Sequence, residues 1–144
     1  MVILHNNKTG NNWIVAKKIA NLINCKTIAI SEEKSINIYE EDVIIFILSN
    51  TGDEEISQPM EDFLYNLNIK KKKYAVCELI NYFGLGNYCG CKKVLFKFLD
   101  NLGWKKLSDL SLDSVPNIDE EKLNLWIESI KKVLAQQKLE QLQN

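Results

Sequence analysis

Short apolar runs alternate along the chain with longer segments in which apolar residues recur at helical spacing. Runs of this length are typical of strands, and a period of about 3.6 residues is typical of helices that cover a core. The expected strands are Val2–Leu4, Lys26–Ile30, Val43–Leu48, Tyr74–Leu79 and Trp104–Leu112. The expected helices cover residues 12–24, a segment opened by Ser57, Gln58 and Pro59, residues 92–102, and a final segment after Asp119. This regular alternation predicts a parallel sheet with helices on both faces.

The run Val43–Leu48 is apolar at every position, whereas a strand with one face in water alternates apolar and polar residues. Such a run indicates a strand that is buried on both faces, in the centre of a parallel sheet. In sheets of this kind, ligands bind beyond the carboxyl ends of the strands, where the strand order reverses. We therefore expect a site in the loops that follow the first, third and fourth strands.

The chain has 144 residues, which is enough for one domain with a full core, and we expect a single domain over 1–144. The weak helical pattern after Gln136 leaves open whether the tail is frayed. No run approaches the roughly 20 apolar residues of a membrane span, and the first residues do not resemble a signal peptide. We expect a cytoplasmic protein without membrane contact. A net charge of −1 argues against a nucleic-acid partner.

Few side chains in the sequence suggest catalysis or metal binding. His5 is the only histidine, and we expect it to pack or to hydrogen-bond to the adjacent loop rather than to serve a catalytic triad. The cysteine spacing does not match a zinc site. We interpret Cys25 and Cys77 as small core residues. A structural role for Cys89 and Cys91 is favoured over a redox pair. We expect neither catalytic residues nor a metal.

The first loop runs from the first strand directly into a helix. It consists of Asn6, Asn7, Lys8, Thr9, Gly10, Asn11 and Asn12. A helix N-terminus offers unpaired N–H groups and the positive end of the macrodipole, so it suits a phosphate. All eighteen basic residues are lysine, so no guanidinium is available, and we expect backbone N–H groups, Thr9 and asparagine amides to hold the anion. An ordinary turn with a helix cap is the alternative interpretation.

Thr9-Gly10-Asn11 after an N-terminal strand resembles the phosphate-binding motif of flavodoxins, usually Ser/Thr-x-Thr-Gly-Asn-Thr. Asn7 and Asn12 stand where that motif has its first and last hydroxyl residues. The resemblance extends from Val2 to about Ile130. It implies a flavodoxin-like three-layer α/β/α fold, with a five-stranded parallel sheet in the order 2-1-3-4-5. It also implies FMN as the cofactor.

The second loop, Ser49–Glu55, resembles the flavodoxin loop in which a Gly-Asp peptide faces N5 of the flavin. The resemblance places Asn50, Thr51, Gly52 and Asp53 beside the ring. Glycine lowers the conformational energy needed to turn that peptide, because it tolerates positive φ. The acidic residues of this loop would disfavour an anionic reduced flavin. An acidic turn that caps a helix is the alternative.

The third loop follows the fourth strand and is rich in glycine, asparagine and aromatic residues. By resemblance to flavodoxins, an aromatic ring closes the outer face of the flavin here. Tyr82 is the first choice and Phe83 the second, and Leu79, Asn81 and Tyr88 complete the candidate residues. Asn-Tyr-Phe-Gly is also similar to the Gly-Asn-x-Asn-Phe-Gly loop of flavoproteins that activate ribonucleotide reductase. Alternatively, these aromatic residues only pack the loop onto the sheet.

The resemblance implies a low-potential one-electron carrier that acts between a reductase and acceptor proteins. Such a carrier is expected to be a monomer, to dock transiently on its redox partners and to be no enzyme. One alternative is a flavoprotein activator of ribonucleotide reductase, which the near-neutral charge favours because carrier flavodoxins are typically strongly acidic. The other is a cofactor-free interaction domain on the same scaffold.

Overall fold

The computed structural model describes residues 1–50, 56–81 and 90–143. Within these residues, five parallel strands form one sheet in the order β2-β1-β3-β4-β5, which confirms the predicted topology. The strands are β1 (Val2–His5), β2 (Lys26–Ala29), β3 (Val43–Asn50), β4 (Lys73–Ile80) and β5 (Lys105–Asp113). The helices are α1 (Gly10–Ile23), α2 (Gln58–Tyr65), α3 (Gly90–Asn101) and α4 (Glu120–Gln143), with a 3-10 turn, η1 (Ile30–Glu32), after β2.

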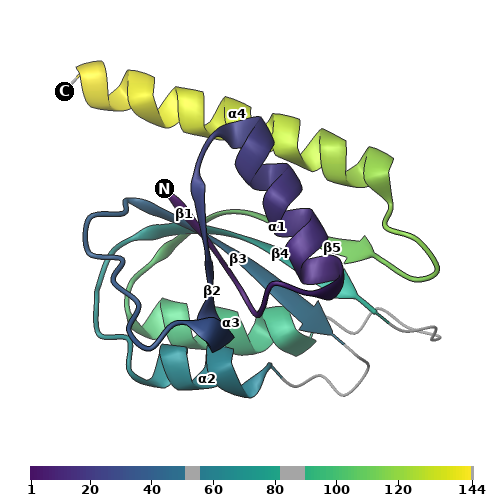
Figure 1. Ribbon diagram of the computed structural model, residues 1–144. Coiled ribbons are helices and arrows are strands. Elements are labelled where there is room, and N and C mark those ends of the chain that lie inside the picture. Colours follow the sequence, from purple (N-terminus) through teal and green to yellow (C-terminus); the bar gives the residue numbers. More distant parts are fainter. Residues whose placement is uncertain (51–55, 82–89, 144) are drawn as a thin grey trace.

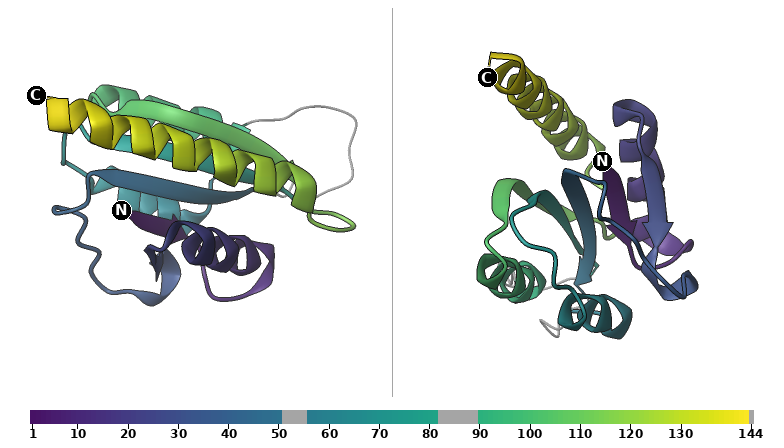
Figure 2. Two further views of the ribbon diagram at one scale, coloured as in Figure 1. Left: turned by 90° about the horizontal axis from the view of Figure 1, so that it is seen from above. Right: turned by 90° about the vertical axis from the view of Figure 1, so that its left-hand side faces the viewer.

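The helices form two layers, one on each face of the sheet. In Figure 1, α1 and α4 lie above the sheet and α2 and α3 lie below it, and the right-hand view of Figure 2 shows the same three layers end-on. Successive residues of a strand point to opposite faces. In β3, Ile44, Phe46 and Leu48 therefore pack towards α2 and α3, and Ile45 and Ile47 pack towards α1 and α4. This double burial confirms the central position predicted for the strand.

The element boundaries differ from the expected ones by a few residues. The second strand ends at Ala29 because Ile30 already begins η1. The first helix begins at Gly10, two residues before the expected start. The last helix is continuous to Gln143, and the idea of a frayed tail stays a prediction. Helix and strand ends are set by local hydrogen bonds that hydrophobic periodicity does not report.

The chain order places the carboxyl end of β1 beside that of β3. From β1 the chain crosses to β2 on one side, and it then returns to β3 on the other side of β1. The two strands pair in register, with Leu4 opposite Phe46. One strand further on, the N–H of Asn81 donates to the carbonyl oxygen of Asn50 at 2.9 Å. The carboxyl ends of β1, β3 and β4 therefore meet at one edge of the sheet, at the point where the strand order reverses.

The cysteines of the described chain form no disulfide with one another. Cys25 and Cys77 are thiols, the Cys91 thiol lies 3.8 Å from the carbonyl oxygen of Ser49, and Cys89 lies outside the described residues. Burial raises the pKa of the Cys77 thiol to about 12, so this side chain is a protonated core residue, as the sequence suggested. In the same described ranges, no three side chains of the metal-binding types gather into a possible ion site. None of the helices described here is long and apolar enough to cross a membrane.

The buried aromatic rings between the sheet and the α2/α3 layer provide a test of the core. Phe46 is fully buried, with its ring 6.2 Å from those of Tyr74 and Trp104. We expect Phe46→Ala to lower the free energy of unfolding by about 3–5 kcal/mol, because it removes a buried ring and leaves a cavity. Tyr39→Ala is the matched control, since Tyr39 is 68% exposed, and it should change stability by less than about 0.5 kcal/mol. Urea unfolding measures both, and equal losses would contradict this account of the core.

Candidate functional site

Residues 6–12, here called the anion loop, are held in shape by their own asparagine side chains. Asn12 Oδ1 accepts from the N–H of Asn7 at 3.1 Å, and Asn12 Nδ2 donates to the Thr9 carbonyl oxygen at 2.6 Å and to Asn7 Oδ1 at 3.0 Å. Asn7 Oδ1 also accepts from the N–H and the hydroxyl of Thr9, at 3.2 and 2.8 Å. These contacts close the loop between the end of β1 and the first turn of α1.

Two residues of the loop, Thr9 and Asn12, direct their polar hydrogens into the loop itself. Asn12 donates both amide hydrogens inside the loop, and the Thr9 hydroxyl is directed at Asn7 Oδ1. These groups therefore shape the loop, and their binding of a phosphate stays a prediction. The exposed side chain of Lys8 belongs to the loop, and its backbone N–H donates to Glu32 Oε2 at 3.0 Å.

The N-terminus of α1 is open. The first N–H groups of a helix have no partner within the helix, and Thr9, the N-cap residue, makes no capping hydrogen bond with its side chain. Gly10 has a φ of +67°, in the left-handed region that favours glycine. A Cβ atom added there would meet nothing within 4 Å. The glycine is therefore required by backbone conformation, and the space beside it is free for a group that binds the helix N-terminus.

A second group of polar residues, here called the edge cluster, joins α1 to the ends of β4 and β5. Asn11 Nδ2 donates to Asn81 Oδ1 and to the carbonyl oxygen of Ser114, each at 3.3 Å. The Ser114 hydroxyl donates to the Ile80 carbonyl oxygen at 2.9 Å and contacts Asn81 Oδ1. Sequence reasoning missed Ser114, although its place directly after the last strand puts it at the same sheet edge as the carboxyl ends of β1, β3 and β4.

The remaining predicted site residues of the described chain lie at or below this edge. Asn50 ends β3 and is fully buried. Leu79 is also fully buried, and its side chain belongs to the core beneath α1 and α4. Asn6 accepts from the N–H of Ser31 at 2.9 Å through its carbonyl, which ties the anion loop to η1. Thr51, Gly52, Asp53, Tyr82, Phe83 and Tyr88 lie outside the described residues, so their roles stay predictions.

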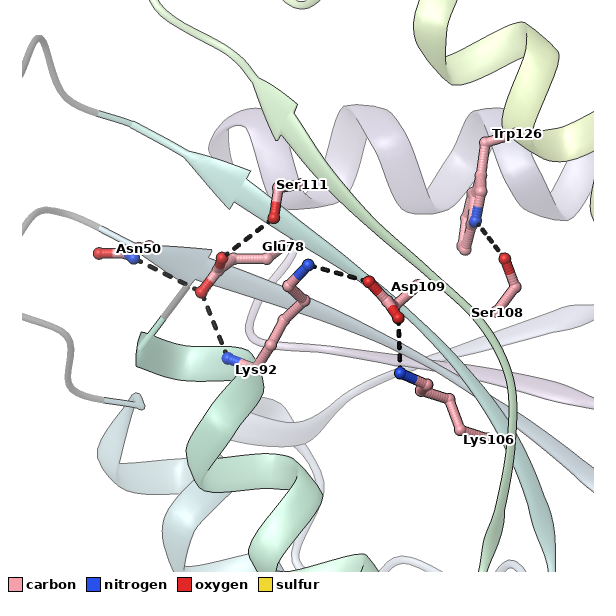
Figure 3. A network of polar contacts seen from close by, with 8 residues as sticks. All are labelled: Asn50, Glu78, Lys92, Lys106, Ser108, Asp109, Ser111 and Trp126. Carbon is pink, nitrogen blue, oxygen red and sulfur yellow. Dashed lines mark hydrogen bonds and ion pairs between the residues drawn. The ribbon is translucent and has the colours of Figure 1, made fainter. Parts of the chain in front are cut away.

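A buried carboxylate, Glu78, lies under the edge on the α3 side of β4 (Figure 3). It accepts from Asn50 Nδ2 at 3.4 Å, from the Ser111 hydroxyl at 3.4 Å and from the backbone N–H of Lys92 at 3.3 Å. Burial raises the pKa of Glu78, and the Lys92 N–H and ammonium offset only part of that rise. The sequence signal was a single acid within an apolar strand.

The Lys92 ammonium binds a different carboxylate, so Glu78 has no direct cationic partner among the described residues. Lys92 Nζ lies 3.0 Å from Asp109 Oδ1, and Lys106 Nζ lies 2.8 Å from Asp109 Oδ2 (Figure 3). Burial opposes ionisation of Asp109, but the hydrogen bonds from Lys106 and Lys92 outweigh it and hold its pKa below the usual range. The ion pairs of Asp109 therefore leave Glu78 with neutral hydrogen-bond donors.

Several solved structures share this architecture. Oxidised flavodoxin 1 from Bacillus cereus superposes with a TM-score of 0.75 at 20% identity, over 93% of this chain and 96% of that one. The flavodoxin of Streptococcus pneumoniae TIGR4 gives 0.70 at 22% identity, over 88% and 94%. A point mutant of the flavodoxin from Pseudomonas aeruginosa gives 0.72 at 17% identity, over 93% and 97%. No family model matches the sequence, and no curated protein sequence matches it either.

At these identities the likeness establishes the fold. The chain has the flavodoxin-like α/β architecture over nearly its whole length, as the sequence motifs predicted. The carboxyl ends of β1, β3 and β4 in this fold bring together the anion loop and the edge cluster. A fold alone does not establish function, so a role for the site depends on its own residues.

Gly10 provides a test of the anion loop. We expect Gly10→Ala to lower the free energy of unfolding by about 1 kcal/mol, because a Cβ disfavours the left-handed conformation. Gly10→Asn should cost less, since asparagine visits that region more readily. Urea unfolding compares the three proteins. Because nothing lies near the added Cβ, equal losses for alanine and asparagine would contradict a conformational cause.

Glu78 provides a pH-dependent test. Because its pKa is raised in the folded protein, the native state binds more protons than the unfolded state just above the ordinary value of 4.5. The wild type should therefore lose stability relative to Glu78→Gln as the pH rises through the folded pKa. Urea unfolding of both proteins from about pH 4 to about pH 8 measures the difference. Stability curves that run parallel over this range would show that the pKa is not raised.

Proposed function

We propose that the protein is an FMN-binding, one-electron carrier. The observation that carries this proposal is the open N-terminus of α1, where Gly10 has a positive φ and faces free space. It lies at the edge where the strand order reverses, which is the usual ligand position in such sheets. The similarity in fold to proteins described as flavodoxins supports the same cofactor here.

The described residues fit the polar part of FMN. The backbone N–H groups at the start of α1 and the Lys8 ammonium would hold the phosphate. The edge cluster, with Asn11 and Asn81, would offer amide groups to the hydroxyls of the sugar chain. FMN, when bound, supplies the redox chemistry, and the protein supplies binding, electrostatics and access.

The lack of arginine makes phosphate binding depend on the backbone. A guanidinium would add a bidentate, fully charged contact, whereas every basic side chain here is a lysine. Aligned backbone dipoles attract an anion only near the helix end, and salt screens the attraction of an exposed lysine. We therefore expect the phosphate to bind mainly through the helix N-terminus, with Lys8 as a secondary contact.

The ring-binding residues are part of the proposal on sequence resemblance alone. Gly52 and Asp53 would face the reacting edge of the ring, and Tyr82 or Phe83 would cover its outer face. Acidic groups near the ring would disfavour added negative charge and so lower the reduction potential. Redox partners would dock transiently over this edge, through a small interface.

Reconstitution with FMN tests the function directly. The purified protein should bind FMN more tightly than riboflavin, since only FMN has the phosphate, and a reductive titration should resolve two one-electron steps. Lys8→Gln should weaken FMN binding by up to about fivefold, the range of an exposed ion pair. Lys138→Gln, in the exposed distal part of α4, is the matched control and should have no effect.

The outcomes separate the candidate functions. A protein that binds neither FMN nor riboflavin would be the cofactor-free interaction domain, and the proposal would be wrong. A net charge of −1 favours the alternative of an activator of ribonucleotide reductase, with the same cofactor. Rapid reaction of the reduced protein with oxygen, together with capture of the reductase in a pull-down, would support that alternative over the carrier.

A further inference from the structure

His5 is a buried polar residue for which the proposed function has no use. It ends β1, it is completely inaccessible to solvent, and its ring stacks on Trp13 at 5.2 Å with an interplanar angle of 16°. An apolar side chain would fill the same space on a buried strand without polar atoms to satisfy. The contacts of its two ring nitrogens show what the histidine adds.

One ring nitrogen contacts the anion loop twice. Nδ1 lies 2.9 Å from the carbonyl oxygen of Asn7 and 3.0 Å from Oδ1 of Asn12. The orientation of the Asn12 amide is set by backbone groups, because Oδ1 must accept from the Asn7 N–H and Nδ2 must donate to the Thr9 carbonyl. Both neighbours of Nδ1 are therefore acceptors, and Nδ1 carries a hydrogen that it donates to them.

The other ring nitrogen has no partner in the described chain. Nε2 is buried and makes no hydrogen bond to any described residue. In the neutral ring it is an acceptor, since the hydrogen is on Nδ1. A buried, unsatisfied acceptor is unfavourable. Leaving Nε2 without a hydrogen bond therefore costs free energy that the Nδ1–H contacts must offset. Those contacts are made with the anion loop.

We propose that His5 is a positioning residue for phosphate binding, which it supports without touching the ligand. Its Nδ1–H fixes the Asn7 carbonyl and the Asn12 amide together, and so fixes how the first turn of α1 leaves the strand. The N–H groups of that turn then face the phosphate. This inference rests on the proposed function, and it assigns a role to a residue outside the ligand contacts.

Three substitutions separate positioning from simple packing. In asparagine, Nδ2 is separated from Cβ by one carbon, as Nδ1 is in histidine, so His5→Asn keeps the donor in place. In glutamine the nitrogen is one atom further out and corresponds to Nε2. Phenylalanine keeps a ring on Trp13 and has no donor. Packing alone therefore favours His5→Phe, and positioning favours His5→Asn.

The experiment measures FMN and riboflavin affinities by calorimetry for the wild type and the three variants. His5→Phe and His5→Gln should bind FMN about tenfold more weakly, because the loop loses a buried hydrogen bond. His5→Asn should stay within about threefold of the wild type. Riboflavin, which has no phosphate, should bind all four proteins alike. Equal losses for both ligands, or an unchanged FMN affinity in His5→Phe, would overturn the proposal.

A second readout does not need the flavin. Inorganic phosphate is titrated into ¹⁵N-labelled protein, and the amide signals of Asn11 and Asn12 are followed. They should shift in the wild type and in His5→Asn, and less in His5→Phe. A wild type that responds to phosphate but binds no FMN would refute the proposed function and leave the role of His5 standing. Equal responses in all variants would refute that role.

If the substitutions of His5 in β1 prevent folding, Asn12→Ala tests the same hydrogen bond from its partner in α1. It removes the amide that accepts from His5, and it should weaken FMN binding about tenfold with little effect on riboflavin. The double variant with His5→Phe should be scarcely weaker than either single variant, because both remove one shared contact. Additive losses would show that the two residues act separately.

Discussion

The side chains of β3 contact α2 and α3 on one face of the sheet and α1 and α4 on the other, and none between Ile44 and Leu48 is polar. This burial on both faces requires helices in two layers, and each helix must cross over the sheet before the next parallel strand. The crossovers bring the carboxyl ends of the strands to a common edge. The position of the anion loop and the edge cluster is therefore a consequence of how β3 is covered.

At that edge, the polar side chains of the anion loop hydrogen-bond to groups of the loop itself. Asn7 and Asn12 stand where the flavodoxin motif has hydroxyl residues, and they hydrogen-bond to one another and to Thr9. Their amides are larger than hydroxyls and span the loop. In the proposed function, the N–H groups at the start of α1 would then be available to the phosphate. The substitution of asparagine is thus compatible with a phosphate site in which the backbone, rather than the side chains, makes the main contacts.

Hydrophobic periodicity was sufficient to predict the strands, the helices and the layers, because burial depends on where apolar residues lie. The order of the strands came from the resemblance of Thr9-Gly10-Asn11 to a known motif. Neither signal reveals the hydrogen-bond partner of a polar side chain. The sequence did not indicate that the two amide hydrogens of Asn12 are donated to neighbours three and five residues away, and its contact with the phosphate stays a prediction. Ser114 was missed because its contacts with Ile80 and Asn81 join parts of the chain more than thirty residues apart.

The internal bonding of the anion loop has a kinetic consequence. Asn7, Asn12 and His5 connect the loop to itself and to the strand before any ligand arrives. The entropy of ordering these residues is then lost when the chain folds and not when the ligand binds. With the ligand proposed here, a preorganised loop of this kind would not need to rearrange on encounter, and association would be limited by access to the sheet edge. Differences in affinity among ligands should then appear in their dissociation rates.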